Sequence, residues 1–220
     1  MRKLTMAKVV GLAVLLLFIG SGILLANDYV PLKEGLSRTY SIGGAVTKTV
    51  EDFEERKLGK KKVVPQKIVI NGSTSFIFIR ETKKGQILFA IQGAEDSEPV
   101  ILEELVYLNK NPFKTGTTWE GDFTTSVMME SVTFPLTYEI QKGKETVTVP
   151  AGTFDKCLKV VAKGEVERDK GLLGMVKITI VQTDWYAPKV GLIKSVLHKS
   201  GNHVLIQEDE TITQLTGYKK

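Results

Sequence analysis

The two histidines of this chain are its clearest candidates for chemistry. His198 and His203 flank a predicted turn at residues 199–202, so they could face each other across a hairpin and share a cation. A structural zinc site takes four protein ligands and a catalytic one takes three, whereas only Glu208 and Asp209 lie nearby in sequence. The pair is a weak metal candidate, and a solvated hairpin tip is the favoured interpretation.

The single cysteine is the second candidate. Cys157 lies in an alternating run in which Lys159 shares its face, and neighbouring lysines can lower the pKa of a thiol. No second cysteine is present to resolve a reactive sulfur or to form an intramolecular disulfide. A half-buried apolar filler is therefore the favoured role for Cys157. The opposite face of the run is formed by Leu158, Val160 and Ala162.

Carboxylates run together at Asp52, Glu54 and Glu55, and again at residues 208–210. Such charged runs are typical of a solvated face, and a glycosidase-like pair would have to be assembled across strands. Nucleophile elbows, phosphate-binding loops, zincin helices and paired Cys-x-x-Cys spacings are absent from the sequence. We therefore predict no enzyme, no catalytic residue and no cofactor. A hydrolase built from distant strands is the least favoured alternative.

The N-terminus has the pattern of an export signal. Arg2, Lys3 and Lys8 precede an uncharged run at residues 9–26, which is longer than a usual cleaved h-region and close to the roughly 20 residues of a membrane span. Residues 1–26 are predicted to be a helical signal peptide or signal anchor, with cleavage favoured. Either outcome places the rest of the chain in the periplasm or on the extracytoplasmic face of the inner membrane.

The charge and length of the remaining residues, 27–220, indicate what kind of domain they form. They include 27 of the 30 basic residues and all 25 acidic ones, so the basic balance of the whole chain does not indicate a nucleic-acid partner. A segment of this length supports one well-buried core, so a single exported domain is expected. Only an uncleaved leader would tie it to the membrane.

Short alternating or β-branched runs separated by Gly, Lys-Gly and Asn-Gly predict antiparallel strands and hairpins. We expect roughly ten strands of ordinary length. The clearest runs are 67–71, 75–80, 86–92, 136–141 paired with 145–149, and a meander of 175–186, 192–198 and 204–215.

Two segments are ambiguous. Residues 47–58 have helical spacing and propensity, but flanking glycines favour an extended, partly exposed strand. Residues 98–113 suit a short helix or a connector that crosses the sheet.

Three motifs together resemble a TapB-like family of exported bacterial proteins. They are YVPLKEG at residues 29–35, VPAGTF at 149–154 and WYAPKVGLIK at 185–194. The resemblance implies a curved antiparallel sheet, half-barrel-like as in envelope lipoprotein carriers, and implies no catalytic residue. Arg38 stands where such relatives often have an aromatic residue. Lys189 stands where they often have Gly, which argues against a positive φ at that turn.

The exported region holds more apolar bulk than a flat sheet can cover, and methionines adapt to ligands of variable shape. A curved sheet could hold an acyl chain on its concave face, although simple core packing is the favoured role of these side chains. The expected function is non-enzymatic binding of a lipid-like or apolar ligand, or of an envelope component. The alternative is an assembly module that recognises protein partners through a sheet edge. The candidate ligand-face residues are Phe76, Phe78, Met128, Met129, Trp119 and Trp185.

Overall fold

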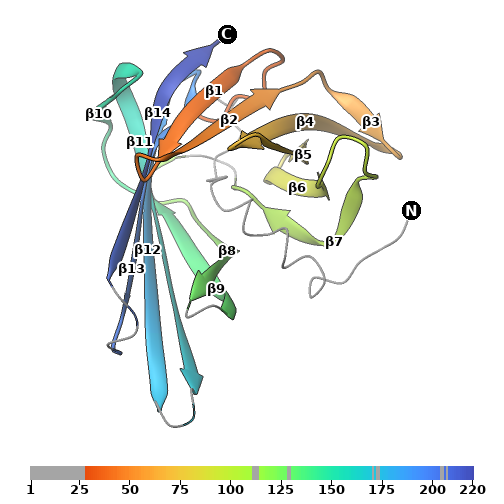
Figure 1. The fold of residues 1–220 in the computed structure, drawn as a ribbon. Coiled ribbons are helices and arrows are strands. Elements are labelled where there is room, and N and C mark those ends of the chain that lie inside the picture. The colour runs from red at the N-terminus through yellow and green to blue at the C-terminus, as the bar shows by residue number, and fades with distance from the viewer. Residues whose placement is uncertain are drawn as a thin grey trace.

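Fourteen β-strands form the regular structure of the described residues (Figure 1). The computed structural model describes residues 28–110, 114–127, 130–169, 171, 174–203, 206 and 208–220. The strands are β1 (Ser37–Ile42), β2 (Val46–Asp52), β3 (Arg56–Leu58), β4 (Lys61–Ile70), β5 (Ser73–Thr82), β6 (Gly85–Gln92), β7 (Val100–Tyr107), β8 (Thr118–Val127), β9 (Glu130–Ile140), β10 (Glu145–Val149), β11 (Gly152–Asp169), β12 (Met175–Ala187), β13 (Gly191–Gly201) and β14 (Asp209–Lys219).

No helix within the described ranges is long and apolar enough to cross a membrane. The leader helix predicted for residues 1–26 lies outside these ranges.

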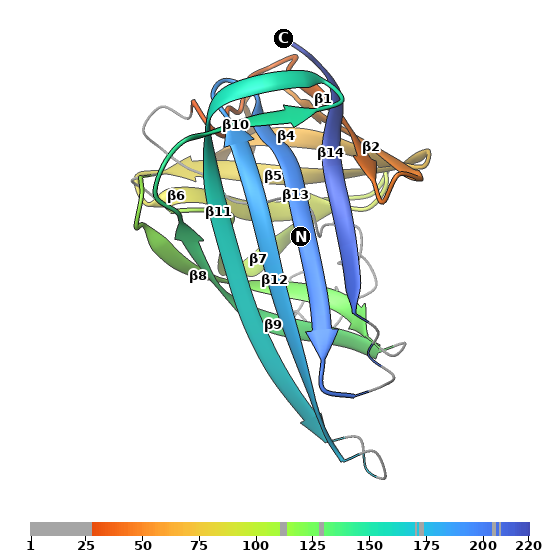
Figure 2. The same cartoon turned by 90° about the vertical axis from the view of Figure 1, so that its left-hand side faces the viewer.

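The strands form one curved antiparallel sheet with two free ends. The order is β7-β6-β5-β4-β2-β1-β14-β13-β12-β11-β9-β8, while β3 pairs with β4 and β10 pairs with β11 off this path. Among the described residues no ladder joins β7 to β8, so the sheet is open. The long strands β11 to β14 lie side by side and cross the direction of β4 to β6 steeply (Figure 2). The predicted mainly-β class and the antiparallel pairing are confirmed.

The hairpins with strong local turn signals are confirmed. Asn71 and Gly72 both have positive φ values, 47° and 84°, as a tight two-residue hairpin requires, and they join β4 to β5. The meander of β12, β13 and β14 is also present. Its third strand begins at Asp209, later than expected.

Two predictions of local structure are wrong. The run at 145–149 forms β10, but it pairs with β11 through the turn at Pro150 and Ala151, while β9 pairs with β8 and β11. The turn at residues 142–144 redirects the chain without making a hairpin, because both sides of β9 are taken by β8 and β11. Residues 98–113 hold strand β7 rather than a helix or connector, and residues 111–113 lie outside the described part. Residues 47–58 are extended as expected, divided into β2 and β3.

The inner face of the curve is packed with the protein's own side chains. Registered pairs place Val50 opposite Ile68 and Gln66 opposite Ile77, and paired residues of antiparallel strands point to the same face. Phe134 and Leu136 are fully buried on β9. Leu158, Val160 and Ala162 are also buried, as their alternation predicts.

The three motifs share one core cluster, which contains Val149 and Val190 and against which Leu32 packs. The hydroxyl of Tyr29 donates a hydrogen bond to the Lys156 carbonyl at 2.9 Å, and the Lys189 amide donates to the Asp28 carbonyl. The Ala151 amide donates to the Leu215 carbonyl at 3.0 Å. Lys189 has a φ of 64°, so the expectation that its side chain argues against positive φ at this turn is wrong. The motifs thus have a structural role.

Candidate functional site

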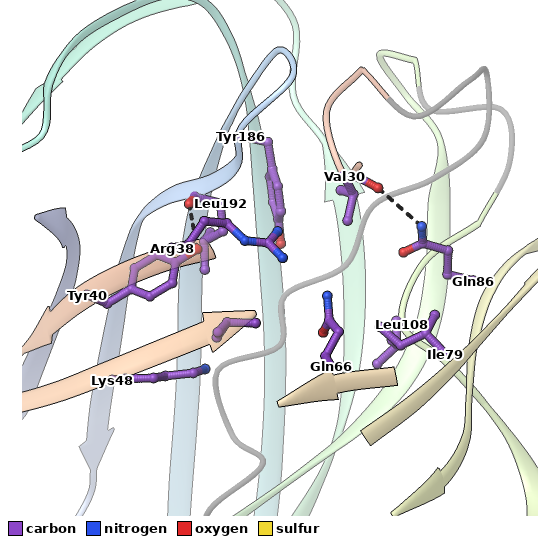
Figure 3. Close-up of a pocket in the computed structure, with 11 residues that line it drawn as sticks. Val30, Arg38, Tyr40, Lys48, Gln66, Ile79, Gln86, Leu108, Tyr186 and Leu192 are labelled. Carbon is purple, nitrogen blue, oxygen red and sulfur yellow. Dashed lines mark hydrogen bonds between the residues drawn. The ribbon is translucent and has the colours of Figure 1, made fainter. Parts of the chain in front are cut away.

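A cavity of about 50 Å³, with both polar and apolar lining, lies inside the curved sheet. Figure 3 shows its lining, which comes from strands far apart in sequence. The polar members are Arg38 and Tyr40 on β1, Lys48 on β2, Gln66 on β4, Gln86 on β6 and Tyr186 on β12. The apolar members are Val30, Val50, Ile79, Leu108 and Leu192.

Strand register brings the polar residues together. Arg38 pairs with Val50 and Tyr40 pairs with Lys48 in the β1–β2 ladder, so all four point to the inner face. Asp52 pairs with Gln66 in the β2–β4 ladder and continues the same row. Alternation along three neighbouring strands therefore carries charged side chains into the interior.

Asp52 is the centre of a buried hydrogen-bond network. Arg38 Nη2 and Gln66 Nε2 both donate to Asp52 Oδ1, the latter at 2.7 Å, and the Lys33 amide donates to Oδ2 at 3.2 Å. Burial raises the pKa of Asp52, while the Arg38 guanidinium opposes that rise. The Asp52 side chain is 0% exposed, so its assignment to a solvated acidic run is wrong. Glu54 and Glu55 are exposed, as predicted.

Lys48 is the second cation of the cavity. It is only 2% exposed, and burial, helped by the nearby Arg38 charge, lowers its pKa to about 7. Its Nζ lies 6.0 Å from the centroid of the Tyr40 ring. The Tyr40 hydroxyl donates to the Leu192 carbonyl at 3.0 Å, and burial raises the pKa of Tyr40 to about 12. The cavity thus combines the Arg38 guanidinium with a buried lysine whose charge is held mainly below pH 7.

A second buried carboxylate, that of Asp184, lies on β12, two residues before the cavity-lining Tyr186. Asp184 accepts hydrogen bonds from Gln182 Nε2 at 2.8 and 3.0 Å and from the Tyr186 hydroxyl at 3.4 Å. Tyr186 also lines the cavity, so it connects Asp184 with the polar side chains of the cavity. Burial raises the pKa of Asp184 to about 6.

The raised pKa of Asp184 predicts a pH dependence of stability. Between its ordinary pKa of 3.8 and its folded value of about 6, the folded state keeps a proton that the unfolded state releases. The Asp184 contribution to the free energy of unfolding should therefore fall as pH rises through this window and stay constant above it. Urea denaturation from pH 3.5 to 7 of wild type and Asp184→Asn measures the difference. The same dependence of the unfolding free energy on pH in the two proteins would contradict a raised pKa at Asp184.

An open groove of about 380 Å³ lies on the other face of the sheet, beside the segment that joins β2 to β3. Phe76 pairs with Lys67 in the β4–β5 ladder, so it points away from the face that carries Ile68 and Ile77. The Phe53 and Phe76 ring centroids are 6.4 Å apart, and Phe53 is 40% exposed. The rest of the groove lining is Glu54, Glu55, Arg56, Pro65, Gln92 and Glu95.

The predicted ligand-face residues do not share one face. Phe76 lines the groove, and Phe78 is fully buried in the cluster beneath it. Trp119 is 2% exposed and stacks on Tyr138 at 5.1 Å. The described candidates that pack together are therefore Phe76 and Phe78 alone, while Met128 and Met129 lie outside the described residues.

Trp185 lies apart from the other candidates. Its Nε1 donates to Glu145 at 2.7 Å, and Lys159 and Lys194 lie 5.4 and 5.1 Å from its ring centroid. The ring is partly buried against the main core cluster. It therefore has its own polar and cationic surroundings rather than a place in a common ligand face.

The remaining chemical candidates are accounted for by local contacts. His198 Nε2 lies 3.2 Å from Glu208 Oε1, and within the described ranges no three His, Cys, Asp or Glu side chains gather into a possible metal site. His203 follows the end of β13. Cys157 is fully buried rather than half-buried, its Sγ donates to the Phe154 carbonyl at 3.2 Å, and burial raises its pKa to about 11.

The cavity residues were missed at the sequence level except for one signal. Arg38 occupies an inward position of an alternating run. A charged residue at such a position has to find a buried partner. Nothing local in sequence identifies Asp52 as that partner, because β1 and β2 first have to pair.

Comparisons with known proteins concern family and fold. A family model described as DUF3108-like matches residues 122–205. A candidate lipoprotein from Parabacteroides distasonis is 19% identical, with 86% of this chain and 97% of that chain covered and a TM-score of 0.46. A candidate exported protein with a YmcC-like fold from Bacteroides fragilis is 14% identical, with 88% and 100% covered and a TM-score of 0.49. The comparison with curated proteins gives no match, and none of these findings names the TapB-like family.

Proposed function

We propose that the chain is a non-catalytic binding protein of the cell envelope, which holds the apolar part of a lipid-like amphiphile in the groove beside Phe53 and Phe76. The observation that carries this proposal is the exposed aromatic ring of Phe53 at a groove of about 380 Å³. Small-molecule sites typically measure about 300–1,000 Å³, and Phe53, Pro65 and Phe76 supply the apolar part of this lining. The polar rim of the groove suits the head group of an amphiphile.

Export supports the envelope location. The basic residues and the uncharged run at 1–26 direct residues 27–220, as a single domain, to the periplasm or to the outer surface of the inner membrane. The motif resemblance to TapB-like exported proteins agrees with this location.

The concave face is the less suitable place for an acyl chain. Its cavity of about 50 Å³ is well below the size of a typical ligand pocket, and core side chains fill the surrounding space. We therefore place the apolar ligand on the opposite face, at the groove.

Replacing Phe53 by serine should weaken amphiphile binding about 10- to 100-fold. Burial of a Phe side chain against an apolar partner is worth about 1.5–3 kcal/mol, and each 1.4 kcal/mol is tenfold in affinity. Solvent extraction and mass spectrometry of the purified proteins measure the retained amphiphile. Titration with a fluorescent amphiphile that has an uncharged or cationic head group measures affinity, because the groove lining holds three glutamates and one arginine.

Tyr218→Ser is the matched control, because Tyr218 is 38% exposed but packs beside Phe154, away from the groove lining. It should bind like wild type. A wild-type protein that retains no amphiphile, or equal loss in both variants, would contradict the proposal.

A second candidate function is recognition of an envelope protein through a sheet edge. It is favoured by the two ends of the strand order, β7 and β8, each of which has one ladder neighbour among the described strands. The extraction experiment separates the two functions, because an edge-binding scaffold has no reason to retain amphiphiles.

A further inference from the structure

The interior cavity has the lining of an anion site. Its two charged lining residues, Arg38 and Lys48, are both cations, and the carboxylate that pairs with Arg38 belongs to Asp52, outside the lining. Gln66, Gln86 and Tyr186 also line the cavity, but their donors already serve Asp52, the Val30 carbonyl and Asp184 respectively. Figure 3 shows the Arg38 guanidinium and the Gln66 amide pointing toward one another.

One donor of this set lacks a partner. Arg38 is 4% exposed and uses Nη2 for Asp52, whereas its buried Nε has no hydrogen-bond partner among the described residues. A buried N–H that makes no hydrogen bond costs free energy, and the cost is larger when the group is charged. An acceptor inside the cavity would remove that cost, and a negatively charged acceptor would form the stronger bond.

We propose that the cavity binds a small monovalent anion, of the size of chloride or formate, which accepts a hydrogen bond from Arg38 Nε and lies close to the Lys48 ammonium group. The volume of about 50 Å³ admits a group of this size and excludes larger organic anions. The anion would join β1 and β2 to the strands across the cavity, since its lining also includes β4, β6 and β12. This site is separate from the groove and does not depend on the proposed function.

The test is a titration of the folded protein with sodium formate at pH 6, below the pKa of about 7 of Lys48. The ionic strength is held constant with sodium gluconate, which is too large for the cavity. The readout is the resonance of the Arg38 Nε–H group in proton–nitrogen spectra. We expect a saturable shift in wild type, and binding at least tenfold weaker in Lys48→Met. A shift that stays absent or linear up to 0.3 M formate in wild type would overturn the proposal, as would unchanged affinity in Lys48→Met.

Lys67→Met is the matched control variant. Lys67 also lies near an aromatic ring, with its Nζ 5.9 Å from the Phe76 centroid, but it is on the outer face and outside the cavity lining. It should bind formate like wild type. If Lys48→Met does not fold, competition in wild type decides: added chloride should raise the formate concentration needed for half saturation, and absence of competition would overturn the proposal.

Discussion

Replacing Asp52 by alanine will lower the free energy of unfolding by about 3–5 kcal/mol, because the Arg38 charge then stays buried without its partner. Asp52 also accepts hydrogen bonds from Gln66 and from the Lys33 amide, so the substitution leaves several donors unsatisfied. Urea denaturation at pH 7 measures the change. A loss of less than about 1 kcal/mol would show that the network contributes little to the fold.

Two further variants separate the cause. Glu55→Ala removes an exposed ion pair with Lys62, and such pairs are worth less than about 1 kcal/mol. The double variant Arg38→Met with Asp52→Leu removes both buried charges and should recover most of the loss, since apolar replacement of a buried pair is often neutral or stabilising. Failure of the double variant to recover would mean that hydrogen-bond geometry, rather than the unpaired charge, dominates the loss.

The second large effect is expected at Gly85, at the start of β6. A Cβ atom there would overlap the carbonyl oxygen of Asn109, and Gly85 has a φ of 137°, a conformation that side chains disfavour. Asn109 is fully buried and holds Gln86 through two hydrogen bonds, of 2.8 and 3.0 Å, so its backbone has little freedom to move. Gly85→Ala should therefore destabilise the protein by about 3 kcal/mol or more.

Gly44→Ala provides the comparison for Gly85. Gly44 also has a positive φ, 78°, but a Cβ there meets nothing within 4 Å. Gly44→Ala should lower the free energy of unfolding by about 1 kcal/mol, the cost of placing a side chain in this backbone conformation. Thermal unfolding of both variants tests the difference, and similar losses in the two would argue against the steric account.

The predictable parts of this fold are those with local physical causes. The Asn71-Gly72 pair adopts its turn because both residues tolerate positive φ, and alternation assigns Val160 and Ala162 to the inner face. The pairing of β9 with β11 depends on ladders between distant segments, which turn signals do not encode.

The candidate site was predicted less well for the same reason. Asp52 belongs to an acidic run in sequence, yet pairing of β1 with β2 and of β2 with β4 places its side chain in the interior. Phe76 and Phe78 were expected on a concave ligand face, but register places Phe76 in the outer groove and Phe78 beneath it. The direction in which the sheet curves determines which face is inside, and it follows from the whole set of strands.

The ladder between β1 and β14 joins the first described strand to the last, with Ser37 opposite Lys219. The ribosome synthesises β1 early and β14 last. One edge of β1 therefore has no partner until nearly the whole chain has been made. Such long-range pairing slows folding and leaves a strand edge exposed meanwhile. A nascent chain that ends before residue 209 therefore has two free edges in addition to those at β7 and β8, on β1 and β13, and is the form most in need of a holding chaperone.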